Sequence, residues 1–130
     1  MKVNKNGFTL IEILITAGII ALLAAIAIPN LLRAKIDSNE AMAQATLKSI
    51  SSALENYMSI NQVYPTNTDD LTNVTPPYLN QNYFTGNYNG YTYSSVLTDY
   101  TYSITAQPVN SSQGIHSYTI SSGGVLTKNP

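Results

Sequence analysis

The residues able to do chemistry in this 130-residue chain are few, and their types limit what that chemistry could be. The sequence contains no Cys and a single His, His116. Soft-metal sites, cysteine nucleophiles, disulfide frameworks and most catalytic triads therefore lack their residues. Asp69 and Asp70 are adjacent, a pattern more typical of a solvated helix cap than of calcium, which takes about six to eight oxygens. The sequence predicts no catalytic residue, no metal site and no cofactor.

Glu12 is the one ionisable residue within positions 8–28, which read FTLIEILITAGIIALLAAIAI. At about 1.5 Å per residue, a helix of this length spans roughly 31 Å, the thickness of the hydrocarbon core of a bilayer. Lys2 and Lys5 precede the segment, so the positive-inside rule predicts that the start stays in the cytoplasm and the rest is exported. The sequence therefore predicts one membrane-spanning helix.

The carboxylate of Glu12 leaves several interpretations of this segment open. A cleaved secretory signal is one, since Ala25-Ile26-Ala27 has the small residues of a cleavage site, although the apolar stretch is long for a signal. A plain membrane anchor is another, with Glu12 reaching the interface or favouring the positive end of the helix dipole. At the centre of a span a carboxylate costs about 2.5–3.5 kcal/mol. A buried charge becomes tolerable beside a cation, and cutting the chain before the apolar run would create one as a new α-amine.

The residues Lys5-Asn6-Gly7 followed by Phe8-Thr9-Leu10-Ile11-Glu12 resemble the processing motif of type IV prepilins and type II secretion pseudopilins. The resemblance covers roughly residues 5–32 and includes Gly18, the run Ala25–Pro29 and Asn30. It implies that a prepilin peptidase cuts between Gly7 and Phe8, and that the same enzyme methylates the Phe8 amine. The paired cysteines of many pilin heads are absent, as is an acidic cluster in residues 107–130, where many major pseudopilins bind calcium.

The resemblance also implies how copies of the chain assemble. In a filament the apolar helices form a bundle core, where the Glu12 carboxylate can meet the Phe8 amine of a neighbouring subunit and set the axial register. A pair within one subunit, at i and i+4, stays open. Gly18 and Pro29 weaken the helix, and Pro29 removes a bond to the Ala25 carbonyl. The family pattern implies a kink or local unwinding between these two positions in the fibre, and the alternative is that Pro29 only begins a new helix at the lipid boundary.

The spacing of apolar residues predicts that the helix continues as an amphipathic segment to about Ile60, with a stripe of residues at steps of three, four or seven: Ile36, Ala43, Leu47, Ile50, Leu54 and Tyr57. Asp37, Glu40, Lys48 and Glu55 are expected mainly off that stripe. Alternating residues predict strands at about 90–97, 100–106, 116–121 and 125–127, with a two-residue link at Thr98-Asp99. Thr68–Leu71 is expected to form a short capped turn.

The predicted fold class is α+β, with a long bent N-terminal helix packed on an antiparallel sheet of three to four strands, the pilin fold. The predicted parts are a removed leader at 1–7, a transmembrane and filament-core helix at 8–29, and a pilin head at 30–130. Seven of the ten tyrosines lie between Tyr78 and Tyr102, and alternation such as Tyr91/Tyr93 and Tyr100/Tyr102 favours packing on one face. An adhesive outer surface, an aromatic electron route and stacking on single-stranded DNA are the alternatives for them.

The predicted function is that of a structural, non-enzymatic subunit of a type IV pilus, with a pseudopilin of a secretion or DNA-uptake system as the alternative. A membrane-anchored enzyme or receptor, or a monomeric anchored binding module, belongs to a different class. The implied partners are further copies of the chain, the prepilin peptidase and an inner-membrane assembly platform. The precursor is expected in the cytoplasmic membrane with its head outside the cytoplasm, and the assembled pilus outside the cell. With a net charge of −1, duplex nucleic acid is not an expected partner.

Overall fold

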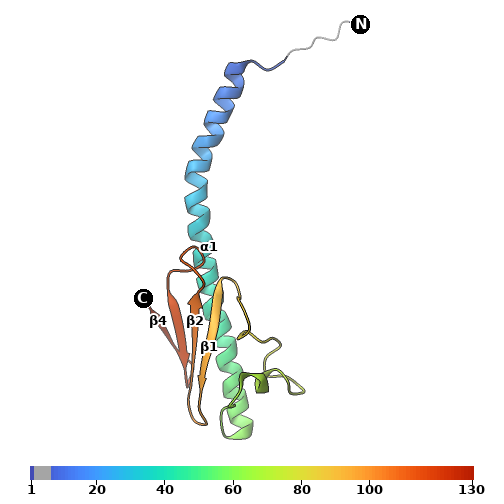
Figure 1. Cartoon of the computed structure of the whole chain (residues 1–130), viewed down its shortest axis with the longest axis vertical. Coiled ribbons are helices and arrows are strands. Elements are labelled where there is room, and N and C mark those ends of the chain that lie inside the picture. Colours follow the sequence, from blue (N-terminus) through green and yellow to red (C-terminus); the bar gives the residue numbers. More distant parts are fainter. Residues whose placement is uncertain (2–6) are drawn as a thin grey trace. The chain divides into compact units, whose positions relative to one another are not determined.

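The computed structural model describes Met1 and residues 7–130. Its elements are one α-helix, one 3₁₀ helix and four strands: α1 (Leu10–Asn61), η1 (Thr68–Leu71), β1 (Tyr91–Leu97), β2 (Tyr102–Pro108), β3 (Ser117–Ser121) and β4 (Val125–Asn129) (Figure 1). The chain forms two compact units that divide between Ala34 and Lys35, and α1 contributes to both. The predicted leader, 1–7, falls mostly on residues 2–6, which lie outside the described residues.

The first unit contains the apolar part of α1. This part is long and apolar enough to cross a membrane, judged by length and composition. Its large apolar side chains are exposed from Leu10 to Leu32, in contrast with a helix buried in a soluble core. Gly18 and Pro29 both lie inside α1. The bend predicted at these positions stays a prediction.

In the second unit, one face of α1 is buried, as the spacing of its apolar residues predicts. Ile36, Ala43, Leu47, Ile50 and Leu54 are all buried. These positions recur every three, four or seven residues, so they share one side of a helix with 3.6 residues per turn. The helix ends at Asn61, where Gln62 adopts a left-handed φ of 64° ahead of Tyr64-Pro65.

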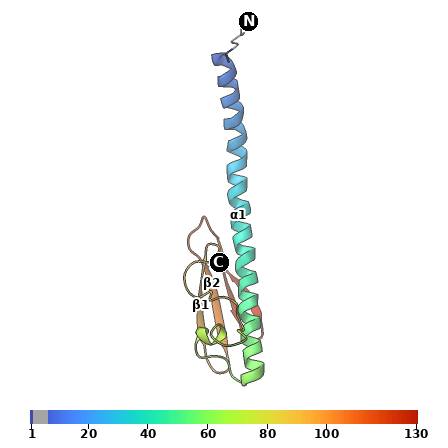
Figure 2. The ribbon, with the colours of Figure 1, turned by 90° about the vertical axis from the view of Figure 1, so that its right-hand side faces the viewer.

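The four strands form one antiparallel sheet in the order β1-β2-β3-β4. Its register aligns Tyr93 with Ala106 and Ala106 with Tyr118, while Ile104 lies opposite Ile120. These residues are buried and alternate with less buried ones, because successive side chains of a strand point to opposite faces. The sheet lies alongside α1 in both views of the second unit (Figures 1 and 2). This confirms the predicted α+β fold of a long apolar helix on an antiparallel sheet.

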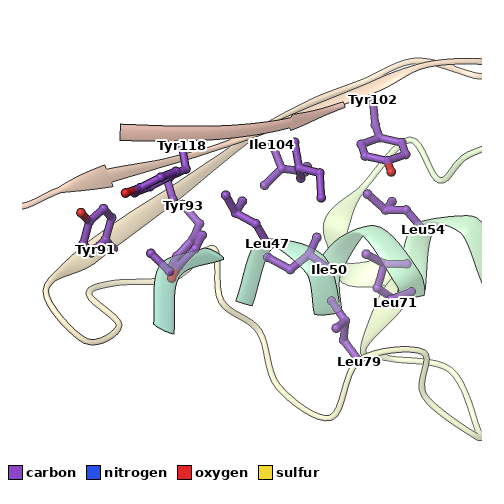
Figure 3. Packing of buried hydrophobic residues seen from close by; sticks show 14 of the residues in the cluster. Leu47, Ile50, Leu54, Leu71, Leu79, Tyr91, Tyr93, Tyr102, Ile104 and Tyr118 are labelled. Carbon is purple, nitrogen blue, oxygen red and sulfur yellow. The ribbon is translucent and has the colours of Figure 1, made fainter. Parts of the chain in front are cut away.

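The core of the second unit lies between α1 and the inner face of the sheet (Figure 3). Leu47, Ile50 and Leu54 point from the helix toward Ile104 and Tyr102 of β2. Leu71 and Leu79, from the segment between helix and sheet, close one side of this layer. Exposing any of these side chains would cost about 1.5–3 kcal/mol each, so their burial holds the helix on the sheet.

Two local predictions were wrong. The connection between β1 and β2 spans four residues, 98–101, rather than two, because Thr98 and Thr101 close the turn with hydrogen bonds between their side chains and backbone. Tyr100 therefore lies in the turn and is exposed, so it does not share the inner face with Tyr102. The short capped turn predicted at Thr68–Leu71 is confirmed as η1, and its cap is Asn67, whose side chain accepts a hydrogen bond from Asp69 N.

Candidate functional site

The predicted processing position lies directly before α1. Gly7 and Phe8 precede the helix, and the Phe8 side chain is 85% exposed. A Cβ built on Gly7 would meet nothing within 4 Å, so the backbone there is open to an approaching group. The geometry leaves the Gly7–Phe8 peptide bond accessible.

Glu12 lies in the first turn of α1, where Thr9 bonds to it reciprocally. Thr9 N and Thr9 Oγ1 donate hydrogen bonds to Glu12 Oε2 at 2.7 and 2.8 Å, and Glu12 N donates to Thr9 Oγ1 at 3.3 Å. This is a capping box, which satisfies backbone N–H groups that a helix start otherwise leaves without partners. Thr9 was not predicted as a partner of Glu12, although a Thr followed three residues later by a Glu is the sequence signal for a capping box.

The capping box changes what Glu12 can do chemically. Both hydrogen bonds from Thr9 reach Oε2, and a carboxylate can accept further donors on its other oxygen, Oε1. Phe8 immediately precedes Thr9, so an amine created at Phe8 would arise beside this capped turn. Glu12 can therefore cap its own helix and accept a cationic donor at the same time.

A second carboxylate, Glu40, joins α1 to the loop between β2 and β3. Its Oε1 accepts hydrogen bonds from Ile115 N at 2.9 Å and His116 N at 3.2 Å, and lies 3.1 Å from His116 Nδ1. Its Oε2 accepts the Tyr118 hydroxyl at 2.7 Å. The side chain is only 13% exposed, so these contacts are shielded from water. We call Glu40, Ile115, His116 and Tyr118 the Glu40 cluster.

The hydrogen bonds of the Glu40 cluster favour the charged carboxylate. Partial burial by itself raises the pKa of Glu40, but the donors Tyr118, Ile115 and His116 outweigh it and lower that pKa to about 2. Burial, together with the bond to Glu40, raises the pKa of Tyr118 to about 12. At neutral pH the cluster therefore joins an ionised carboxylate to a protonated phenol, which is a strong, charge-assisted hydrogen bond.

A third carboxylate, Glu55, also joins α1 to other segments by hydrogen bonds, near the other end of the helix–sheet interface. Its Oε1 accepts the hydroxyls of Tyr64 and Tyr102, each at 3.1 Å, and the backbone N–H of Gly123 at 3.0 Å. Ser51 also lies 2.7 Å from the Tyr102 hydroxyl. Burial, followed by the bond and charge of Glu55, raises the pKa of Tyr64 to about 12. The two carboxylates thus tie α1 to both ends of the sheet.

The expectation that Glu40 and Glu55 lie mainly off the buried stripe was therefore incomplete. Glu40 is four residues after Ile36 and three before Ala43, so its spacing places it within the stripe. An acid in that position needs donors, and the tyrosine-rich strands supply them. The prediction that the tyrosines between Tyr78 and Tyr102 mostly pack inside is confirmed: three are buried and three more pack partly buried against the core, whereas Tyr100 is exposed.

The remaining acidic residues of the head stay apart from these clusters. Asp69 Oδ1 accepts a hydrogen bond from Asn82 Nδ2 at 3.3 Å. Within the residues that the structure describes, no three His, Cys, Asp or Glu side chains gather into a group that could hold a metal ion.

Comparison with known families matches two parts of the chain. Residues 2–28 match the prokaryotic N-terminal methylation motif, and residues 30–125 match the family of type II secretion system protein G. The second match covers well over half of the chain, including all of β1, β2 and β3 and the first residue of β4.

Several curated proteins are similar in sequence. This chain is 45% identical over 64 residues to a type IV wide pilus major component of Thermus thermophilus, and the match covers 49% of each chain. It is 39% identical over 61 residues to a type IV major pilin of Myxococcus xanthus, covering 47% of this chain and 28% of the pilin. It is 34% identical over 84 residues to a type II secretion system core protein G of Escherichia coli, covering 62% of this chain and 58% of that protein. The matched residues span about half or less of the first relatives' length, and no solved structure matches significantly.

Proposed function

The chain belongs to the type II secretion system protein G family, whose relatives include type IV pilins and pseudopilins, and we propose that it is a structural subunit of a type IV pilus. It would polymerise through the first part of α1 into a surface filament used for adhesion, motility or related roles. Its work in that assembly is structural rather than enzymatic.

One observation carries the proposal. The part of α1 that lies in the first unit, Leu10 to Ala34, is apolar and exposed and contains a single carboxylate; we call it the stem, and it precedes the folded head. In water this stem would expose apolar surface at a cost of about 25 cal/mol per Å². It needs either lipid or other stems around it. A membrane before assembly and a helix bundle after assembly supply these two environments in turn.

Processing at the start of the stem is part of the proposal. A prepilin peptidase cuts between Gly7 and Phe8 and methylates the new Phe8 amine. The methylation motif at residues 2–28 and the exposed, open backbone at Gly7 support this. The precursor then lies in the cytoplasmic membrane with its head outside the cytoplasm, and an inner-membrane assembly platform extracts it into the fibre.

The Glu12 carboxylate and the Phe8 amine of a neighbouring copy form the proposed assembly pair. The capping box holds the carboxylate in a defined place, which reduces the entropy lost when the amine binds. Unwinding between Gly18 and Pro29 would let the stem adjust its length in the bundle. Pro29 makes this feasible because it cannot donate the hydrogen bond of a regular helix.

Isolating filaments tests the proposal. Filaments sheared from cells are expected to contain this chain starting at methylated Phe8, seen by electron microscopy and peptide mass. A protein that retains residues 1–7, or that starts at Ile28 and is found only as a soluble monomer, would contradict it.

A second candidate is a pseudopilin of a type II secretion system, because the matched family carries that description. The lack of any carboxylate in residues 107–130 favours the pilus, since many major pseudopilins bind calcium there. Deleting the gene separates the two. Loss of surface filaments with normal protein secretion supports the pilus, whereas loss of secretion without loss of surface filaments supports the pseudopilin.

A further inference from the structure

An open apolar groove lies at the end of the second unit where α1 ends. It has a volume of about 330 Å³ and is lined by Tyr57, Ile60 and Asn61 of α1 and by residues 74–78. The rings of Tyr57 and Tyr78 meet edge to face with centroids 5.3 Å apart, so packed aromatic rings form part of its lining. Ile60 is 68% exposed. Apolar surface arranged in this way favours an apolar occupant.

The opposite end of the same unit carries an exposed apolar side chain on a fixed loop. Ile115, in the segment between β2 and β3, is 64% exposed. Its own backbone N–H donates to Glu40, which lies twenty residues before Ile60 on α1. At about 1.5 Å per residue the two features are roughly 30 Å apart along the helix. The groove and Ile115 therefore belong to opposite ends of one unit.

The loop that carries Ile115 is held rigidly. Besides the bonds to Glu40, Asn39 Nδ2 donates to Gln113 O at 2.8 Å, and Val109 N donates to Gly90 O at 2.9 Å. The Tyr91 hydroxyl donates to His116 O at 2.8 Å from beneath. A loop fixed in this way loses little conformational entropy when it binds, so its exposed isoleucine is suited to insertion into a partner.

The charges at the two ends disfavour pairing of like ends. Asp69 and Asp70 lie in η1, whose Leu71 carbonyl accepts from Tyr78 N of the groove, and Asp99 O accepts from Tyr64 N at the same end. Two groove ends facing each other would bring these acids together. At the loop end Lys35 and Lys128, which pairs with Tyr118 across β3 and β4, offset the charges of Asp37 and Glu40, so this end can approach the acidic end without net like-charge repulsion.

From this geometry we propose that Ile115 of one copy inserts into the groove formed by Tyr57, Ile60 and residues 74–78 of the next copy. The contact joins unlike surfaces, so it repeats from copy to copy and extends into an open filament instead of closing as a dimer. The proposal rests on the proposed function, since it needs copies that polymerise. It assigns to the heads an axial contact in addition to the one between the stems.

Cross-linking in filaments tests this contact, because the chain has no cysteine of its own. Ser111→Cys and Asn73→Cys place thiols on exposed positions beside Ile115 and beside the groove. With both changes in one full-length chain, a short thiol-reactive cross-linker is expected to give a ladder of multimers. A mixture of the two single variants should give dimers only. Adding Ile115→Ser should lower the cross-linked yield by about tenfold, which is the loss of binding expected when an interface residue of moderate importance is truncated.

Two controls make the outcome specific. Val125→Ser, at a similarly exposed position on β4, should leave the ladder unchanged. Ser111→Cys combined with Thr127→Cys should give no ladder. Filaments that yield no ladder, or a ladder that survives Ile115→Ser, would overturn this contact while leaving the proposed function intact. A parent chain that forms no filaments would contradict both proposals.

Discussion

Glu40 shows how one side chain can tie together segments that are distant in sequence. It lies on α1, and its hydrogen-bond donors Ile115, His116 and Tyr118 follow more than seventy residues later. An ionised carboxylate without donors would be costly at this degree of burial, so helix, loop and β3 are coupled at this point. The stability of the head should therefore depend on the charge of Glu40.

This dependence predicts acid sensitivity. The pKa of Glu40 falls from the ordinary 4.5 to about 2 in the folded state, so the unfolded chain takes up the proton first as pH decreases. The stabilisation is fully present above about pH 4.5 and is lost as pH falls toward about 2, for a total of roughly 3 kcal/mol. Urea unfolding of the detergent-solubilised chain at a series of pH values measures this.

The matched variants are Glu40→Gln and Asp37→Asn, since Asp37 is an exposed acid on the same helix. Glu40→Gln should flatten the decrease below pH 4.5, whereas Asp37→Asn should retain it. Equal slopes in the parent and Glu40→Gln would show that the carboxylate does not carry the effect.

Gly114 offers a second prediction at the level of a single residue. A Cβ at this position would overlap the hydroxyl and ring of buried Tyr91. Gly114→Ala should therefore destabilise the head by about 1–3 kcal/mol, the usual cost of overpacking. In the double variant with Tyr91→Ala, where the ring is absent, adding Gly114→Ala should cost much less. A double-mutant cycle of urea unfolding measures the difference, and strict additivity would contradict the steric explanation.

At the level of elements, α1 serves two environments with one helix. Its first part carries apolar residues on all sides, and its second part carries them on one face. The change lies near the boundary between the two units, at Ala34 and Lys35. The amphipathic part depends on the sheet for its stability, whereas the first part requires lipid or neighbouring helices.

Truncating one buried side chain of α1 tests the packing of helix on sheet. Leu47 is fully buried among residues of the core, so Leu47→Ala should lower the free energy of unfolding of the head by about 2–5 kcal/mol. Met42→Ala, at a position exposed on the same helix, should change it by no more than about 0.5 kcal/mol. Thermal or urea unfolding followed by circular dichroism gives both values. Similar losses for the two variants would contradict the assigned helix face.

At the level of the whole molecule, function depends on what surrounds the stem. The capping box allows Glu12 to bind Thr9 within its own chain, and the proposed amine of the next copy adds a charge that Thr9 does not have. Capping and charge pairing make different demands on the side chain. Glutamine satisfies the first and not the second.

Substituting Glu12 separates these two roles. Glu12→Leu removes both capping and charge, while Glu12→Gln keeps a capping acceptor and removes the charge. Both variants should insert into the membrane and be cleaved after Gly7, and both should assemble poorly if the pair with the Phe8 amine drives assembly. The yield of sheared filaments and the mass of the N-terminal peptide measure assembly and cleavage. Normal filaments from Glu12→Gln would refute the charge pair and leave capping as the role of Glu12.

Much of the fold could be predicted from the sequence by local rules. The run 8–28 contains enough apolar residues to identify a membrane span, and the 3.6-residue period identifies the buried face of α1. The strands follow from alternating β-branched and aromatic residues, with ends within about two residues of those observed. Leader, cleavage, methylation and unwinding remain predictions from the motif, because they depend on an enzyme and on neighbouring copies.

The roles of Glu40, Glu55 and Ile115 required the tertiary structure. Nothing near Glu40 in sequence identifies Tyr118 as its donor, and nothing near Ile115 shows that its loop is held at the end of the head opposite the groove. Sequence periods describe which way a side chain points from its own element, and so they determined the stem, the buried stripe and the fold class. Contacts between distant segments arise only when the sheet packs on the helix, and that packing decided which acids are clamped and which apolar residues stay exposed.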